Sequence, residues 1–246
     1  MDIIKLNNLS KEYKSEKGGC LKVLDNLSFT ISRGSITGII GQSGCGKTTL
    51  IEIIASLQSP TAGNVWIEDN ILPFVIFQQY NKTLFPYLNL EQNVEIALRK
   101  DNKKKEKSLE ALHIVGLEKF SKYYPWQISG GMQQRVCVAR ALALRSSIIL
   151  LDEPFSALDT LSKNKLEDDL LEIVNRFKIT CLYVTHDIDS AIYLSDRIIV
   201  LYGRPAHIIK DFEINLCDLR NQVETKKSNE FLMYRENIYN TVLTNE

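Results

Sequence analysis

The chain has 246 residues, of which 44% are hydrophobic and 24% charged, and its 30 basic side chains equal its 30 acidic ones. A chain of this length and composition buries enough apolar surface to fold as one large domain without disulfides or metals, which excludes disorder as its main state. A formal net charge of zero gives no overall positive field for nucleic acid or anionic lipid, so we expect no nucleic-acid partner.

The sequence also predicts where the chain works. Its first residues hold no apolar run of the signal-peptide type, and nowhere do 18 consecutive apolar residues occur, so neither export nor a membrane span is expected. The 5 cysteines are odd in number and widely spaced, which is typical of reduced thiols. We therefore expect a cytoplasmic chain that reaches a membrane only through a partner.

Three short apolar runs predict the strands of an α/β core. Residues 36–40 read as a buried strand, a glycine-rich stretch follows, and residues 48–57 have helical apolar spacing. The runs 148–151 and 181–184 also end at polar residues and precede helical patterns. Continuous apolar runs of this kind are typical of parallel strands that are buried on both faces. Such strands carry active groups at their carboxyl ends.

The segments between and after these runs read as helices. One apolar stripe predicts a helix over about 161–177, and residues 81–145 are helical in pattern and Lys-rich, which predicts an inserted helical subdomain. We expect the core and β subdomain in 1–80 and 146–212, and a C-terminal tail in 213–246 with a terminal helix. The apolar face of that helix would consist of Phe231, Tyr234, Ile238 and Val242.

Residues 41–48 read GQSGCGKT and match the phosphate-loop pattern G-x-x-x-x-G-K-[ST] between a strand and a helix. Glycines allow a tight turn whose N–H groups point at phosphate oxygens, and the helix adds partial positive charge. Lys47 would reach the β and γ phosphates, and Thr48 would bind Mg²⁺. The nucleotide-binding residues expected here are Gly41, Gln42, Ser43, Gly44, Cys45, Gly46, Lys47, Thr48 and Thr49. The alternative is a glycine-rich turn with an exposed lysine.

Two acidic residues, Asp152 and Glu153, follow the apolar run 148–151. Such a pair can divide its work: Asp152 holds Mg²⁺, and Glu153 polarises the water that attacks the γ phosphorus. The alternative is a helix N-cap ahead of Pro154.

A second Ser-Gly-Gly turn, Ser129 to Gly131, opens an amphipathic stretch and predicts another anion site at a helix N-terminus. Asp159 ends the segment SALD after Asp152, and His186 lies just beyond the run 181–184. With these segments in this order, over about residues 3–205, the sequence resembles the ATP-binding subunits of ABC transporters.

The resemblance implies a P-loop NTPase (RecA-like) core with an antiparallel β subdomain and an inserted α-helical subdomain. It makes Ser129, Gly130 and Gly131 the signature motif, Asp159 the D-loop carboxylate and His186 the switch histidine at the γ phosphate. It makes Gln78 the Q-loop glutamine, which is a ligand of the metal. It also makes Tyr13, which we expect before the first strand pair, the aromatic residue whose ring stacks on adenine. Alternatives remain: Gln79 in place of Gln78, and a structural role for Tyr13 or His186. We expect His113 and His207 to be structural.

The resemblance also implies cofactors and partners. These are ATP and Mg²⁺, and a head-to-tail homodimer in which each ATP lies between Lys47 of one subunit and Ser129 to Gly131 of the other. Integral membrane permease subunits would dock on residues 80–94, where Phe85, Pro86, Tyr87 and Leu88 form an apolar cluster, and a solute-binding protein would take part indirectly. The chain would then be peripheral, on the cytoplasmic face of the membrane.

Three segments resemble the ATP-binding subunits of nitrate, sulfonate and taurine importers, namely LFPYLNLEQNV, SGGMQQRVCVARAL and DEPFSALDTLSK. That group also includes importers of some thiamine-precursor pyrimidines. An ABC exporter subunit, a soluble ABC-type ATPase with a regulatory or scaffold role, and a small-molecule P-loop kinase remain alternatives. The Lys-rich run 99–107 is interpreted as a solvated face.

Overall fold

The computed structural model describes residues 1–14, 19–69, 71–79, 83–98, 101–156, 158–217 and 219–244. Some expectations fall outside these ranges. They concern Tyr80 to Lys82 in the expected docking stretch, Arg99 and Lys100 in the Lys-rich run, and Ala157 before the expected D-loop aspartate.

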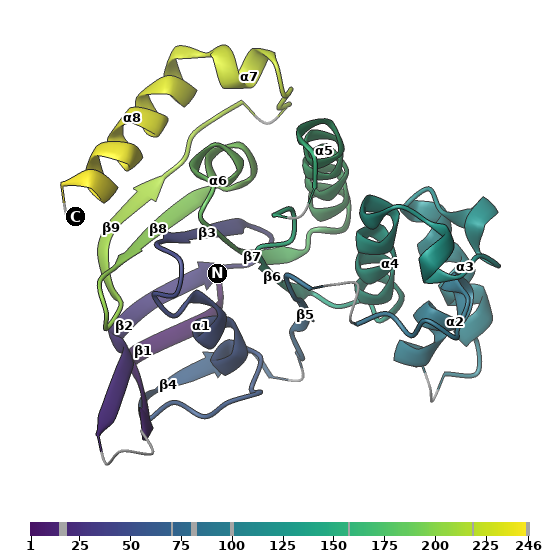
Figure 1. Ribbon diagram of the computed structural model, residues 1–246, viewed down its shortest axis with the longest axis horizontal. Coiled ribbons are helices and arrows are strands. Elements are labelled where there is room, and N and C mark those ends of the chain that lie inside the picture. The colour runs from purple at the N-terminus through teal and green to yellow at the C-terminus, as the bar shows by residue number, and fades with distance from the viewer. Residues whose placement is uncertain are drawn as a thin grey trace.

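The strands of the described residues form two sheets (Figure 1). A three-stranded antiparallel sheet has the order β2-β1-β4, and a six-stranded sheet has the order β5-β6-β7-β3-β8-β9. All neighbours in the larger sheet are parallel except β8 and β9. The strands are β1 (Asp2–Lys14), β2 (Cys20–Ser32), β3 (Ile36–Gly41), β4 (Ala62–Ile67), β5 (Phe74–Ile76), β6 (Ile148–Asp152), β7 (Thr180–Thr185), β8 (Arg197–Tyr202) and β9 (His207–Glu213).

The predicted helices are present, with small differences at their ends. They are α1 (Lys47–Ile54), α2 (Leu90–Glu95), α3 (Lys104–Ile114), α4 (Gly130–Ala143), α5 (Thr160–Phe177), α6 (Ile188–Leu194), α7 (Glu224–Lys227) and α8 (Asn229–Leu243), with 3₁₀ turns at 96–98, 118–120 and 125–127. Helix α1 ends earlier than predicted because Ser56 adopts a φ of 59° and breaks the helical path. None of the described helices is both long and apolar enough to cross a membrane.

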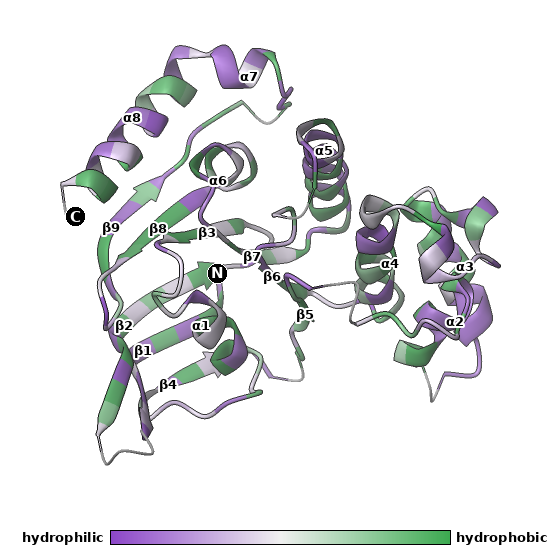
Figure 2. Ribbon diagram, in the orientation of Figure 1, coloured by the Kyte–Doolittle hydropathy of each residue, from purple (hydrophilic) through white to green (hydrophobic). Residues whose placement is uncertain are grey.

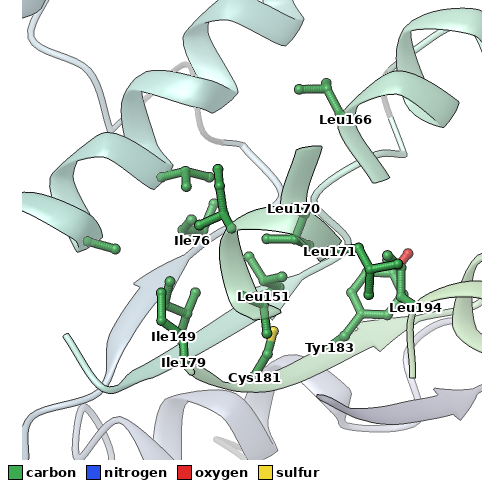
Figure 3. Close-up of a cluster of buried hydrophobic side chains, with 14 of the residues drawn as sticks. Ile76, Ile149, Leu151, Leu166, Leu170, Leu171, Ile179, Cys181, Tyr183 and Leu194 are labelled. Carbon is green, nitrogen blue, oxygen red and sulfur yellow. The ribbon is translucent and has the colours of Figure 1, made fainter. Parts of the chain in front are cut away.

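The larger sheet is buried on both faces, as its continuous apolar strands predict. Alternate residues such as Ile39, Leu150 and Leu182 pack against α1 and the three-stranded sheet. Their neighbours face the other side, where Figure 3 shows Leu151 and Tyr183 beneath the α5 side chains Leu170 and Leu171. This three-layer packing fixes the strands whose ends carry the candidate site.

Helices α2, α3 and α4 form a separate group beside the sheets (Figure 1). Arg140 of α4 holds this group together, because its guanidinium donates to the Asn93 and Thr83 carbonyl oxygens and to Asn93 Oδ1, each over 2.8 Å. Figure 2 shows mostly polar colour on α3, where Lys104 is exposed and Lys107 pairs with Asp101. This part of the Lys-rich run is a solvated face, as predicted.

The terminal helix α8 packs on α6 and the larger sheet. Phe231 and Ile238 are buried in the core, and Tyr234 and Val242 pack partly against it, which confirms the predicted apolar face. An ion pair between Arg235 and Asp189, 2.9 Å long, joins α8 to α6. The tail is therefore part of the folded body.

Candidate nucleotide-binding site

The candidate site lies where the five parallel strands of the larger sheet end. The loop 42–46 follows β3, Asp152 and Glu153 lie at the end of β6, and His186 follows β7. Gln78 follows the edge strand β5, and Arg204 follows β8. Because the carboxyl ends of parallel strands meet at one edge, residues far apart in the sequence come together there.

The loop between β3 and α1 needs glycine at two positions. Gly44 and Gly46 have φ angles of 74° and 115°, which side chains adopt at a cost. A Cβ atom on Gly46 would also lie 2.8 Å from side-chain atoms of Val23 and Leu24 on β2. Glycine is thus favoured at position 44 by conformation, and at position 46 by both conformation and space.

Lys47 opens α1 and is 6% exposed. Its Nζ donates to the carbonyl oxygens of Gly41, 2.7 Å away, and Gln42, 3.1 Å away. Glu153 Oε1 lies 3.8 Å from the same ammonium. The lysine charge is therefore held between the loop backbone and the carboxylate of Glu153.

The oxygen-bearing side chains of Thr48 and Asp152 lie side by side. The Thr48 hydroxyl donates to Asp152 Oδ2 over 2.8 Å, and Asp152 is 4% exposed. Burial raises the pKa of the Asp152 carboxyl, and the hydrogen bond from Thr48 opposes that rise. Hydroxyl and carboxylate oxygens suit Mg²⁺, which commonly takes its other ligands from water and phosphate. The described residues include no group of three His, Cys, Asp or Glu side chains that could hold a metal ion.

Glu153 stands between a lysine and a histidine. Its backbone has a φ of 49°, in the left-handed region that non-glycine residues rarely adopt, and its N–H donates to Val184 O over 2.9 Å. His186 Nδ1 lies 2.8 Å from both carboxylate oxygens. Strain of this kind is typical of functional sites, and here it directs the carboxylate toward Lys47 and His186.

Gln78 is linked to the same segment. Its Nε2 donates to Ser156 Oγ over 3.3 Å, and Ser156 Oγ donates to the carbonyl oxygen of Glu153 over 3.0 Å. The edge strand β5 thereby connects through Ser156 to the segment that carries Glu153.

The signature residues and Asp159 begin two other helices. Ser129 caps α4, with its Oγ accepting from Met132 N over 3.3 Å, and Gly130 and Gly131 form the first turn. Asp159 caps α5, and hydrogen bonds from Ser162 and Leu161 lower the pKa of its carboxyl. Figure 1 shows α4 in the separate helical group, away from α1. A single chain does not bring Ser129 to Gly131 against Lys47.

Tyr13 lies within β1, not before the first strand pair as expected, because the β1–β2 hairpin extends through Lys14. Its hydroxyl donates to Gln58 Oε1 over 2.7 Å, and the Lys11 ammonium lies 5.0 Å from its ring centroid. These contacts fix the ring beside the segment that follows α1.

Arg204 is a site residue that the sequence did not indicate. Its Nη2 donates to the carbonyl oxygen of Ser43 over 2.8 Å. The turn that carries it is tied to β2, since Ala206 N donates to Val23 O and Asp25 N donates to Ala206 O, each over 2.9 Å. Arg204 thus holds the Ser43–Gly44 peptide of the loop in place. The role of Arg204 depends on its hydrogen bond to a loop 161 residues away in the sequence. The residues next to Arg204 therefore form no motif that could have predicted this role.

Comparisons with known proteins identify the relatives of this chain. The family model described as "ABC transporter" matches residues 24–156. The chain is 42% identical to the aliphatic sulfonates import ATP-binding protein SsuB of Bacillus thuringiensis subsp. konkukian over 226 residues, 89% of each chain. It is 37% identical to the nitrate import ATP-binding protein NrtC of Synechocystis sp. over 237 residues, 91% of this chain and 35% of that protein.

A solved structure is similar across nearly the whole fold. The "Dimeric Structure of MJ0796, a Bacterial ABC Transporter Cassette" superposes with a TM-score of 0.75 and 33% sequence identity. The superposition covers 87% of this chain and 100% of the chain in the solved structure.

Proposed function

The chain belongs to the ABC transporter family, and from this premise we propose that it binds and hydrolyses ATP as the ATP-binding subunit of an importer for a small anionic solute. The observation that carries the catalytic part is the position of Glu153. Its carboxylate lies between the Lys47 ammonium, 3.8 Å away, and His186 Nδ1, 2.8 Å away. This is the edge of the sheet at which β3 ends and the phosphate loop begins.

The residues divide the work as their chemistry allows. Loop N–H groups and Lys47 bind the phosphates, while Arg204 keeps the loop backbone in position. Thr48 and Asp152 would hold Mg²⁺, with Gln78 as a further ligand; the ion supplies charge neutralisation of the phosphates. Glu153 takes the proton of the attacking water, and His186 orients Glu153 and contacts the γ phosphate.

The second half of each site comes from another copy of the chain. The separation of α4 from α1 in Figure 1 supports this proposal, as does the dimeric form of the similar solved cassette. Ser129, Gly130 and Gly131 at the start of α4 would supply backbone donors to the γ phosphate held by the partner. Asp159, at the start of α5, would lie at the same dimer face, and Tyr13 would stack on the adenine.

The apolar turn before α2 is proposed as the docking point of the permease. Asn93 fixes this turn, because it accepts from Phe85 N over 2.8 Å and donates to the carbonyl oxygens of Phe85 and Leu88. Leu90 and Val94 are core residues, whereas Tyr87 is 71% exposed beside Phe85. An exposed aromatic residue on a rigid turn is typical of a protein contact.

The names of the relatives support the class of solute. The similar proteins are named for the import of aliphatic sulfonates and of nitrate, both small anions. We propose import of a solute of this kind, with taurine or a thiamine-precursor pyrimidine as further candidates. A solute-binding protein would deliver it, and the ATPase would sit on the cytoplasmic face of the membrane.

Co-purification tests this function. The chain, expressed with a permease whose gene neighbours its own, should be recovered from detergent-solubilised membranes as a complex that hydrolyses ATP; the first step is to search the flanking genes for one. Tyr87→Asp should release it from the permease while ATP binding remains. Trp66→Asp is the matched control, because Trp66 is an exposed aromatic residue on β4, outside the docking turn. Recovery only in a soluble complex would support the scaffold alternative.

A further inference from the structure

Helices α5 and α6 lie on the same face of the larger sheet, and an ion pair joins them near their starts (Figure 1). Lys163 of α5 donates from its Nζ to Asp187 Oδ2 over 2.5 Å. The Lys163 side chain is 20% exposed and that of Asp187 37% exposed, so the pair is partly buried. Partial burial reduces solvent screening and strengthens an ion pair relative to one on the open surface.

Asp187 follows His186 and caps α6. Its Oδ1 accepts from Ser190 N over 2.9 Å, and its own N–H donates to Thr185 Oγ1 over 3.0 Å. One carboxylate therefore accepts from the first turn of α6 with one oxygen and from Lys163 with the other. Because His186 lies between Thr185 and Asp187 in the chain, these bonds hold its backbone from the side of α6.

A second carboxylate, Glu167, lies one turn further along α5, with Oε1 3.8 Å from Lys163 Nζ. Glu167 is fully buried and accepts from Ser190 Oγ over 2.5 Å. Gln222 Nε2 and Lys226 Nζ lie 3.1 and 3.6 Å from its other oxygen. These contacts tie α5 to α6 without Lys163, so we expect the two helices to stay packed when Lys163 is replaced.

The ion pair borders the cavity that also contains the proposed base. Glu153, Lys163, His186 and Asp187 all line one cavity of about 420 Å³. His186 Nδ1 lies 2.8 Å from Glu153, but the His186 side chain is 63% exposed, so packing leaves much of the ring unsupported. We propose that Lys163 is a positioning residue, which acts through Asp187 to hold His186 against Glu153. Its effect on the rate rests on the proposed function, whereas its effect on the place of His186 does not.

Hydrogen exchange followed by mass spectrometry tests the structural step, whether or not ATP is hydrolysed. Lys163→Met removes the ammonium and keeps most of the apolar stem. Peptides that contain Asp187 and Ser190 should exchange at least about threefold faster in this variant, because the carboxylate that caps α6 loses its second anchor. Lys165→Met is the matched control, since Lys165 is an exposed lysine of the same helix that does not line this cavity. Equal exchange in the two variants would overturn the proposal.

Steady-state kinetics tests the effect on the reaction. In Lys163→Met, kcat should fall about threefold to tenfold, as expected for the loss of a partly buried ion pair, while the affinity for ATP stays within about twofold. Lys163→Arg retains a charged donor and should restore kcat to within about twofold of the unaltered chain. Equal losses of ATP affinity and kcat, or no recovery with arginine, would contradict a positioning role.

Asp187→Asn covers the case in which Lys163→Met does not fold. Asparagine keeps an oxygen for Ser190 N but loses the charge that pairs with Lys163, so it should give the same faster exchange and lower kcat. The double variant should be no slower than either single variant, because both changes remove one contact; additive losses would refute the inference. If the unaltered chain does not hydrolyse ATP, the proposed function fails, and the exchange comparison still decides whether Lys163 positions His186.

Discussion

Replacing Glu153 by Gln tests the catalytic assignment most directly. Gln has the same shape, retains an oxygen that can accept from His186, and leaves the N–H bond to Val184 O intact. Only the basic carboxylate is lost. A general base contributes about 10² to 10⁴ in rate, so we expect hydrolysis to fall by that factor, or about 3 to 5 kcal/mol in the activation barrier.

Binding should respond in the opposite way. Glu153 lies 3.8 Å from the Lys47 ammonium, and removing its charge leaves that ammonium free to interact with phosphate. ATP affinity should therefore stay equal or increase, and the closed dimer should accumulate with ATP because hydrolysis no longer opens it.

The assay is single-turnover hydrolysis with protein in excess, together with equilibrium ATP binding and light scattering for the dimer. Asp189→Asn is the matched control, since it also removes one carboxylate near His186, but from α6 and from an ion pair with Arg235. That control should hydrolyse ATP at nearly the original rate. Turnover of Glu153→Gln within twofold of the unaltered chain would remove Glu153 from the role of base.

Other changes test separate contacts. Lys47→Ala should weaken ATP binding at least tenfold, because charged hydrogen bonds contribute about 1.5 to 3 kcal/mol; retained micromolar affinity in a binding titration would contradict the phosphate-loop assignment. Arg204→Gln should raise the KM for ATP about threefold to tenfold with little change in kcat, and Arg204→Lys should restore part of it; an unchanged KM would show that the bond to Ser43 O does not position the loop. Burial raises the pKa of the Cys45 thiol, so less thiolate forms at neutral pH and alkylation, followed by mass spectrometry, should be slower than at exposed Cys20 and slower still with ATP; equal rates at both cysteines would refute this. Ile238→Ala should lower the free energy of unfolding in urea by about 2 to 5 kcal/mol, since Ile238 is fully buried on the inner face of α8; a loss below about 0.5 kcal/mol would show that the tail is not part of the core.

Much of the fold could be predicted because its signals are local. The complete burial of β3, β6 and β7 follows from continuous apolar runs, and the apolar stripe of α5 follows from its helical spacing. The end of α1 was less predictable, because the left-handed Ser56 has no distinct sequence signal. The sequence predicts Tyr13 before the first strand pair, although the hairpin includes it, because polar residues near a strand end do not mark its boundary.

For the site, the sequence by itself determined the residues whose chemistry depends on their immediate neighbours: the glycines and lysine of the loop, the Asp152–Glu153 pair and the Ser129 turn. Tertiary structure decided which of these meet. It placed His186 against Glu153 and brought Arg204 to Ser43 across 161 residues. A turn or a helix cap is specified by bonds within a few residues, whereas contacts between strand ends exist only once the sheet has formed and its register is set.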